Sequence, residues 1–218
     1  MFSSLFDLFW PQVCPLCDRE ARVELVHSRC LERLPRARAL DGDMVIACFE
    51  DGPSWFQLLH RWKYGGERRL AGTVATCMAS EWAALGGEEI LVPLPDDPGR
   101  RLERGYSPVQ DLARALAVRT GLQVDAHLLR RARQTPSQTS CGNDGARHTN
   151  ILGAFRVGDL SRWPRSRPIV LVEDQVTSGA TVLEATKLLG ARGARVRVWC
   201  GARAARAPRQ LDVTGGRH

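Results

Sequence analysis

The segment from Pro168 to Gly193 constrains the fold more than any other part of the chain. Pro168–Val172 is an apolar run typical of a strand that is buried on both faces, and Gly179–Gly193 has the composition of a helix. Between them lie two adjacent acids and a short turn rich in hydroxyl groups. A buried strand that leads straight into a helix is the building unit of a parallel α/β sheet.

The rest of the chain repeats this alternation of strand and helix. Strands are predicted at 44–49, 89–94, 168–172 and 195–200, and helices at 54–64, 67–85, 107–120 and 179–193. We therefore predict an α/β fold with a mainly parallel sheet. Ligands of such sheets bind beyond the carboxyl ends of the strands, so chemistry is expected in the loops after Leu94 and Val172.

The turn that opens the predicted helix at 179–193 is suited to binding an anion. Backbone N–H groups at a helix N-terminus, together with the hydroxyls of Thr177, Ser178 and Thr181, form such a site. The neighbouring carboxylates of Glu173 and Asp174 repel a phosphate but accept hydrogen bonds from a diol, with or without a metal ion. The combination suits ribose 5-phosphate. The alternative is an ordinary strand–loop–helix with a Ser/Thr N-cap.

The same segment resembles the type I phosphoribosyltransferase signature, in which two acids precede Thr-Thr/Ser-Gly-x-Thr, with Glu173 in place of the commoner Asp. Further motifs are similar to the ComF family, which groups competence-linked and GntX-like bacterial proteins. They lie at Lys63–Gly65, Pro93–Pro95, Arg100–Tyr106, Gln110, Leu112–Ala113, Arg131–Gln138, Arg147, Asn150 and Gly153–Phe155. The resemblance extends from about residue 10 to about residue 200, and implies a sheet of the type I phosphoribosyltransferase type.

This resemblance implies that the chain binds phosphoribosyl pyrophosphate together with Mg²⁺. The segment Pro98–Tyr106 has little apolar surface with which to pack, and its cations repel one another, so it is expected to be a loop that is mobile without ligand and closes over the pyrophosphate. Its arginines suit this role, because guanidinium groups are permanently charged and form two parallel hydrogen bonds to phosphate oxygens. The implied ligand-binding residues are Glu173, Asp174, Thr177, Ser178, Gly179, Ala180, Thr181, Arg101, Arg104 and Lys63. If the chain is an enzyme, it is a phosphoribosyltransferase of the glycosyltransferase class. Asp174, Glu173 and Arg104 are then its catalytic residues, and the nucleophile is not identified.

The resemblance also implies a link to DNA uptake and natural competence. The alternative to an enzyme is a non-catalytic, ligand-binding accessory factor that handles imported single-stranded DNA. The net charge of +7 favours anionic partners such as phosphates, nucleotides or nucleic acid, although much of it can be a solvated surface. The partners that the resemblance implies are phosphoribosyl pyrophosphate and single-stranded DNA or the DNA-uptake machinery. Nearly all of the positive charge is arginine, since Lys63 and Lys187 are the only lysines. No aromatic-rich platform for stacking single strands is evident.

Four residues near the N-terminus have the spacing of a structural zinc site. Cys14, Cys17, His27 and Cys30 form a C-x₂-C-x₉-H-x₂-C pattern, in which each short-spaced pair can hold one edge of a tetrahedral ion. The alternative is two buried cysteines and an incidental histidine. ComF-like proteins usually have four cysteines here, so His27 departs from the family pattern.

We predict three parts in the chain. They are an N-terminal amphipathic segment with the zinc module at 1–40, a phosphoribosyltransferase-like domain at 41–204, and a flexible tail at 205–218. No stretch reaches the roughly 18 apolar residues of a membrane span. The odd number of seven cysteines and the absence of a secretion signal argue against a disulfide framework and predict a cytoplasmic protein.

Overall fold

The computed structural model describes residues 12–21, 24–38, 43–80, 88–132, 151–159, 167–205, 207–208 and 210–211 of the chain. The predicted amphipathic segment at the N-terminus, the motifs at 133–138 and 147–150, and the predicted tail beyond residue 211 lie outside these residues. Within the described ranges, no helix is long and apolar enough to cross a membrane.

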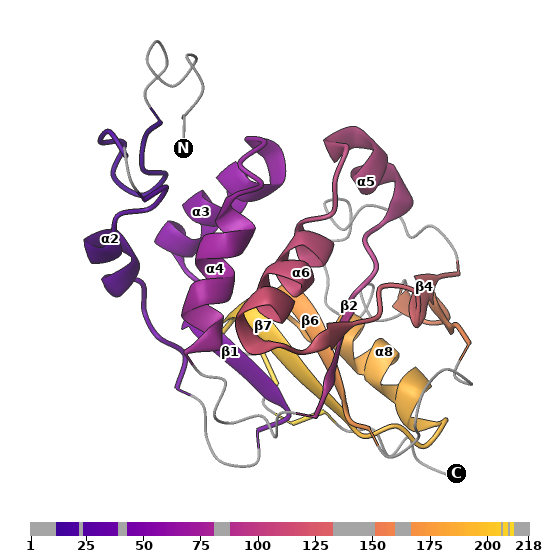
Figure 1. Cartoon of the computed structure of the whole chain (residues 1–218). Helices are drawn as coiled ribbons and strands as arrows, with labels where there is room; N and C mark the ends of the chain where they lie inside the picture. The colour runs from indigo at the N-terminus through magenta and orange to yellow at the C-terminus, as the bar shows by residue number, and fades with distance from the viewer. Residues whose placement is uncertain are drawn as a thin grey trace.

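A five-stranded sheet forms the centre of the molecule (Figure 1). All its strand pairs are parallel, which confirms the predicted fold class. In spatial order the strands are β1 (Val45–Glu50), β7 (Val196–Arg203), β6 (Ile169–Val176), β2 (Ile90–Pro93) and β3 (Gln123–Val124). The central strand β6 is apolar over its first four residues because helices cover both faces of the sheet.

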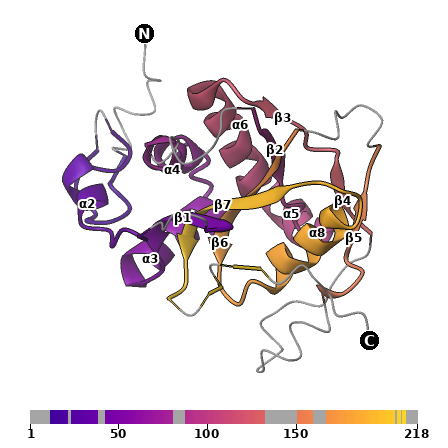
Figure 2. The same cartoon turned by 90° about the horizontal axis from the view of Figure 1, so that it is seen from below.

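The two faces of the sheet bury separate clusters of apolar side chains. Val170 and Val172 pack with three helices on one face, whereas Ile169 and Leu171 face the other side, because side chains alternate along a strand. The first face carries α3 (Pro53–Tyr64), α4 (Leu70–Ala79) and α6 (Pro108–Thr120), and the second carries α8 (Ala180–Gly190). Figure 2 shows α4 and α6 on the side of the sheet opposite α8.

Helix α5 (Pro98–Arg104) corrects the prediction of a loop over Pro98–Tyr106. Asp97 caps this helix, its side chain accepting hydrogen bonds from the backbone N–H groups of Gly99 and Arg100. Pro98 occupies the first turn, and Gly105 ends the helix in the left-handed conformation at φ 73°. Asp, Pro and Gly at these positions are ordinary helix signals, which the high charge of the segment obscured.

A second, two-stranded antiparallel sheet was absent from the sequence prediction. Its strands β4 (Leu129–Arg131) and β5 (Phe155–Val157) pair across a long connection, and each has three residues. Such short strands have no readable periodicity. Leu129 and Phe155 belong to the core cluster that contains α8, so tertiary packing holds this small sheet in place.

The N-terminal module docks against α3. It contains α2 (Ser28–Glu32), and its buried Leu25, Val26 and Leu34 share one core cluster with Leu58 and Trp62 of α3. The segment that follows runs beside β1. There Ala37 N–H donates to the Cys48 carbonyl at 3.2 Å, and Glu50 N–H donates to the Pro35 carbonyl at 2.8 Å. These bonds cover the edge strand, which would otherwise present unpaired backbone groups.

Gly201 of β7 lies at a close approach between α3 and β6. A Cβ at this position would be 2.7 Å from the ring of Trp55 and 2.8 Å from the carbonyl oxygen of Asp174. Trp55 is 1% exposed, so its ring cannot move into solvent to relieve the contact. The hydrogen side chain of Gly201 therefore permits α3 to pack beside the acidic part of β6.

We predict that Gly201→Ala lowers the free energy of unfolding by about 1–3 kcal/mol, the usual cost of overpacking a core. Urea unfolding followed by circular dichroism measures this change. Gly190→Ala in the last turn of α8 is the control, because a Cβ there meets no atom within 4 Å. Equal stability of the two variants would contradict the packing argument.

Candidate functional site

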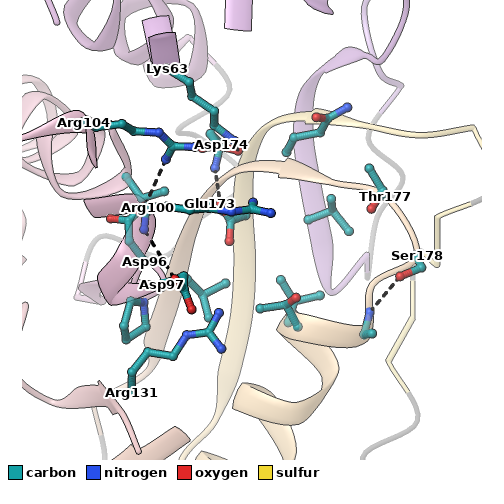
Figure 3. A pocket seen from close by; sticks show the side chains of 18 of the residues that line it. Lys63, Asp96, Asp97, Arg100, Arg104, Arg131, Glu173, Asp174, Thr177 and Ser178 are labelled. Atoms are coloured by element: carbon teal, nitrogen blue, oxygen red, sulfur yellow. Dashed lines mark hydrogen bonds and ion pairs between the residues drawn. The ribbon is translucent and has the colours of Figure 1, made fainter. Parts of the chain in front are cut away.

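A cavity of about 520 Å³ opens beyond the carboxyl ends of β2 and β6, where the sequence predicted the chemistry (Figure 3). Six segments line it. They are the end of α3 at 63–64, the loop 94–97, the inner side of α5, Val109 of α6, Arg131 of β4, and residues 173–182 from β6 into α8. Of the ten predicted ligand-binding residues, nine contribute to this lining, and Arg101 does not.

The cavity arises from a difference in length between neighbouring strands. β2 pairs with β6 only as far as Pro93 opposite Val172, whereas β7 pairs with β6 to Val176. The last four residues of β6 therefore have a strand on one side only. Glu173 and Asp174 are the first residues in this stretch, so their side chains line the cavity.

The two acids are partly neutralised by Lys63. Its Nζ donates to Oδ1 of Asp174 at 2.7 Å, and the Asp174 N–H donates to Oε1 of Glu173 at 2.9 Å. Burial and the negative charge of Asp174 raise the pKa of Glu173 well above its usual value, while Lys63 opposes this shift. Burial thus disfavours the charged form of Glu173, whereas the charge of Asp174 is paired with Lys63.

The turn before α8 lies across the cavity from these acids (Figure 3). Gly179 begins α8 in the left-handed conformation at φ 80°, and a Cβ there would be 2.7 Å from Pro208. Glycine is therefore required by both backbone conformation and space. The Ser178 hydroxyl lies 3.5 Å from the Ala180 nitrogen, and the other free N–H groups of the first helical turn remain available to an anion.

Helix α5 contributes two arginines to the cavity lining, Arg100 and Arg104. Nη1 of Arg104 lies 3.8 Å from Oδ1 of Asp96, and its guanidinium stacks over the Tyr64 ring at 4.9 Å. Its side chain is 7% exposed. Residues four apart share one face of a helix, so Arg100 lies on the same face as Arg104. Arg101 lies on a different face and is exposed.

The sequence analysis missed Arg100, Arg131 and the acids Asp96 and Asp97. Recognising α5 as a helix would have selected Arg100, since its phase follows from Arg104. Arg131 begins one of the motifs that resemble the ComF family, but nothing in that motif assigned it to the cavity, because its place there depends on how the β4–β5 sheet packs on α8. Burial lowers the pKa of Arg131. Burial also raises the pKa of Asp96, and the Ser107 hydroxyl opposes this second shift by donating a hydrogen bond to the Asp96 carboxylate.

The four predicted metal ligands lie together in the N-terminal module. The ligand atoms of Cys14, Cys17, His27 and Cys30 all lie within 4.8 Å of one another. Sγ of Cys17 is 3.3 Å from Nδ1 of His27, and Nε2 of His27 lies 3.0 Å from the carbonyl oxygen of Glu20. A hydrogen bond from Nε2–H to that carbonyl would leave Nδ1 free to coordinate, a common arrangement for metal-bound histidine.

The thiols of this cluster differ in acidity. A hydrogen bond from the backbone of Arg19 lowers the pKa of Cys17 to about 7, and burial raises that of Cys30 to about 11. Three sulfurs and one imidazole nitrogen are a ligand set that binds a structural metal ion. The cluster can therefore hold such an ion.

The raised pKa of Glu173 predicts a pH-dependent cost to folding. Above its ordinary pKa of about 4.5 the unfolded chain releases this proton while the folded chain retains it, so the stability of the wild type falls as the pH rises. Glu173→Gln should become progressively more stable than the wild type between this pH and the raised folded pKa. Urea unfolding of both proteins across this pH range measures the difference in stability. Glu50→Gln at the exposed end of β1 is the control. A constant difference at all pH values would contradict the assignment.

No protein-family model matches the chain. The DNA utilization protein YhgH of Salmonella typhimurium is 29% identical over 196 residues, which cover 86% of this chain and 82% of that protein. Competence protein F of Haemophilus influenzae is 25% identical over 199 residues, which cover 88% of this chain and 84% of that protein.

Solved structures with a similar arrangement include two adenine phosphoribosyltransferases. One has a TM-score of 0.41 and 14% identity, covering 66% of this chain and 74% of the other. The second, from Trypanosoma brucei in complex with AMP, pyrophosphate and ribose-5-phosphate, has a TM-score of 0.40 and 11% identity, covering 64% and 66%. From its sequence relatives, the chain is a homologue of the DNA utilization protein YhgH and competence protein F, which confirms its resemblance to the ComF family.

Proposed function

We propose that the cavity binds phosphoribosyl pyrophosphate with Mg²⁺, and that the chain acts as a phosphoribosyltransferase-like protein. One observation carries this proposal. The Thr177–Thr181 turn at the start of α8 and the acids of β6 open into the same cavity, so anion donors and diol acceptors face a single ligand.

Each part of the ligand has a matching group in the lining. The 5-phosphate would accept hydrogen bonds from the N–H groups and hydroxyls of the Thr177–Thr181 turn. The ribose diol would donate to Glu173 and Asp174, and the pyrophosphate would face Arg104 and its neighbour Arg100. The carboxylates of the lining suit a ligand that arrives with a divalent cation.

In a transferase reaction, a nitrogen nucleophile forms a bond to C1 of the ribose as the bond from C1 to the pyrophosphate oxygen breaks. Positioning of the sugar and stabilisation of the departing charge supply most of the catalysis in such a reaction. We assign these roles to Asp174, Glu173 and Arg104.

Relatives named for DNA utilization and competence support a second function. In this alternative the chain binds the same ligand without turning it over, and serves as an accessory factor for imported single-stranded DNA. Incubation with Mg²⁺, phosphoribosyl pyrophosphate and a panel of bases and amines separates the two. Release of pyrophosphate supports the enzyme, whereas ligand binding without release, together with binding of a labelled oligonucleotide, supports the accessory factor.

We also propose that the Cys14–Cys30 cluster holds one structural zinc ion. Three cysteines and a histidine are a common ligand set for structural zinc, and the module presents them within one small cluster. Because the apolar residues of the module share a core cluster with α3, the ion would also help to fix the position of α3, whose last turn carries Lys63.

We predict that Asp174→Asn weakens binding of phosphoribosyl pyrophosphate by on the order of tenfold or more, because the diol loses a charged acceptor. Isothermal titration calorimetry with Mg²⁺ present measures the change. Asp111→Asn is the matched control, since Asp111 lies on α6, pairs with Arg68 and is not part of the cavity. Unchanged affinity in Asp174→Asn would contradict the assignment of the diol site.

Elemental analysis of the purified protein is expected to find one zinc ion per chain. His27→Ala should lose most of this zinc and unfold at a lower temperature, since the docked module loosens from α3. His60→Ala on α3 is the control and should keep its zinc. Protein without zinc, or equal zinc in both variants, would contradict the ligand assignment.

A further inference from the structure

Lys63 forms an unusual contact for a residue at a phosphate-binding cavity. Its amine is not directed at the anion-binding turn but is bonded to Oδ1 of Asp174 at 2.7 Å. The Asp174 side chain is 5% exposed and that of Lys63 is 21% exposed, so water screens the pair only weakly. Lys63 therefore occupies one of the acids to which the diol of the ligand would bind.

The backbone that carries Lys63 is firmly held. Lys63 lies in the last turn of α3, next to the fully buried Trp62, and the hydroxyl of Tyr106 donates a hydrogen bond to the Trp62 carbonyl. The Gly65 N–H closes the helix by donating to the Arg61 carbonyl at 2.9 Å. The helix end is thus anchored, and a change of partner by the amine would involve the side chain alone.

The carboxylates around this amine explain why a cation is held there. Asp96, Glu173 and Asp174 influence one another electrostatically, and Lys63 opposes the repulsion felt by both Asp96 and Glu173. Arg104 lies against Asp96, and Arg100 and Arg131 also line the cavity. Within the described residues, Asp174 forms one ion pair, and its partner is Lys63.

The choice of lysine is informative in this chain, which has 29 arginines and two lysines. An arginine would hold a carboxylate with two parallel hydrogen bonds in a fixed geometry. A lysine amine is a point charge on a flexible stem, and it can exchange one anionic partner for another by rotating that stem. The position next to Asp174 therefore has the basic side chain better suited to changing partners.

We propose that Lys63 is a tethered counter-ion, which neutralises Asp174 in the free protein and transfers to the pyrophosphate when the Mg²⁺ complex of phosphoribosyl pyrophosphate binds. The transfer rests on the proposed function, whereas the counter-ion role does not. Lys63 is a positioning residue in this scheme. A ligand that carries pyrophosphate gives the displaced amine a new partner, and ribose 5-phosphate gives it none. Lys63 thereby selects for the pyrophosphate form of the ligand.

The first experiment compares the affinities of wild type and Lys63→Met for two ligands by calorimetry with Mg²⁺ present. Lys63→Met should bind ribose 5-phosphate more tightly, because no ion pair has to be broken, and phosphoribosyl pyrophosphate more weakly, each by about tenfold. Lys187→Met changes the other lysine of the chain, which lies on α8 outside the cavity lining, and should leave both affinities unchanged.

Opposite changes for the two ligands are the signature of the proposal. Equal weakening of both would show that Lys63 supports the fold or the phosphate only, and would overturn it. Lys63→Arg keeps the charge and should retain the fold, and it should bind phosphoribosyl pyrophosphate less tightly than the wild type if an exchange of partners is required. Wild-type affinity in Lys63→Arg would overturn the argument for lysine.

The second experiment needs no ligand and tests the counter-ion role alone. Limited acetylation followed by mass spectrometry gives the reaction rates of Lys63 and Lys187 in one sample. Asp174→Asn should accelerate acetylation of Lys63 several-fold and leave Lys187 unchanged, because the amine loses its ionic partner. An unchanged rate at Lys63 would overturn the counter-ion role. Failure of the wild type to bind either ligand would instead overturn the transfer and the proposed function, while leaving the labelling result intact.

Discussion

The pairing of β6 with a longer strand on one side and a shorter strand on the other is the constraint on which the site depends. Hydrogen bonds to β7 continue to Val176, whereas those to β2 end at Val172. The cavity begins where β2 ends, and the backbone of β6 remains ordered there by β7 alone. The acids, the Thr177–Thr181 turn and α8 follow one another in sequence along this half-paired stretch and beyond it, so their relative positions are set by one continuous segment of chain.

The same geometry accounts for the electrostatics of the cavity. Acids placed at the end of a buried strand lose hydration and repel one another, which raises the pKa of Glu173. The fold offsets this cost with cations from elements far apart in the chain, namely Lys63 of α3 and Arg104 of α5. A ligand that brings positive charge to these acids would offset part of the same electrostatic cost.

Particular elements show how far the sequence could predict this arrangement. The Thr177–Thr181 turn, the acids and the Cys14–Cys30 cluster could be singled out from the sequence because each is encoded by residues close together in the chain. Helix α5 was mistaken for a loop, although Asp97, Pro98 and Gly105 mark its ends. In this helix Arg100 lines the cavity and the predicted Arg101 does not, and the face that a residue occupies can be assigned only once the helix is recognised. The docking of the N-terminal module on α3 had no local signal at all.

The sequence by itself determined the fold class, the order of the main strands and helices, and the two clusters of candidate site residues. These depend on periodicity and short spacings, which act over a few residues of chain. Only the tertiary structure decided which cations reach the acids, because Lys63 and Asp174 are 111 residues apart and no local pattern relates them. The position of Arg131 and the unequal lengths of β2 and β7 likewise depend on packing between distant segments. The charge balance of the cavity is therefore a property of the folded chain.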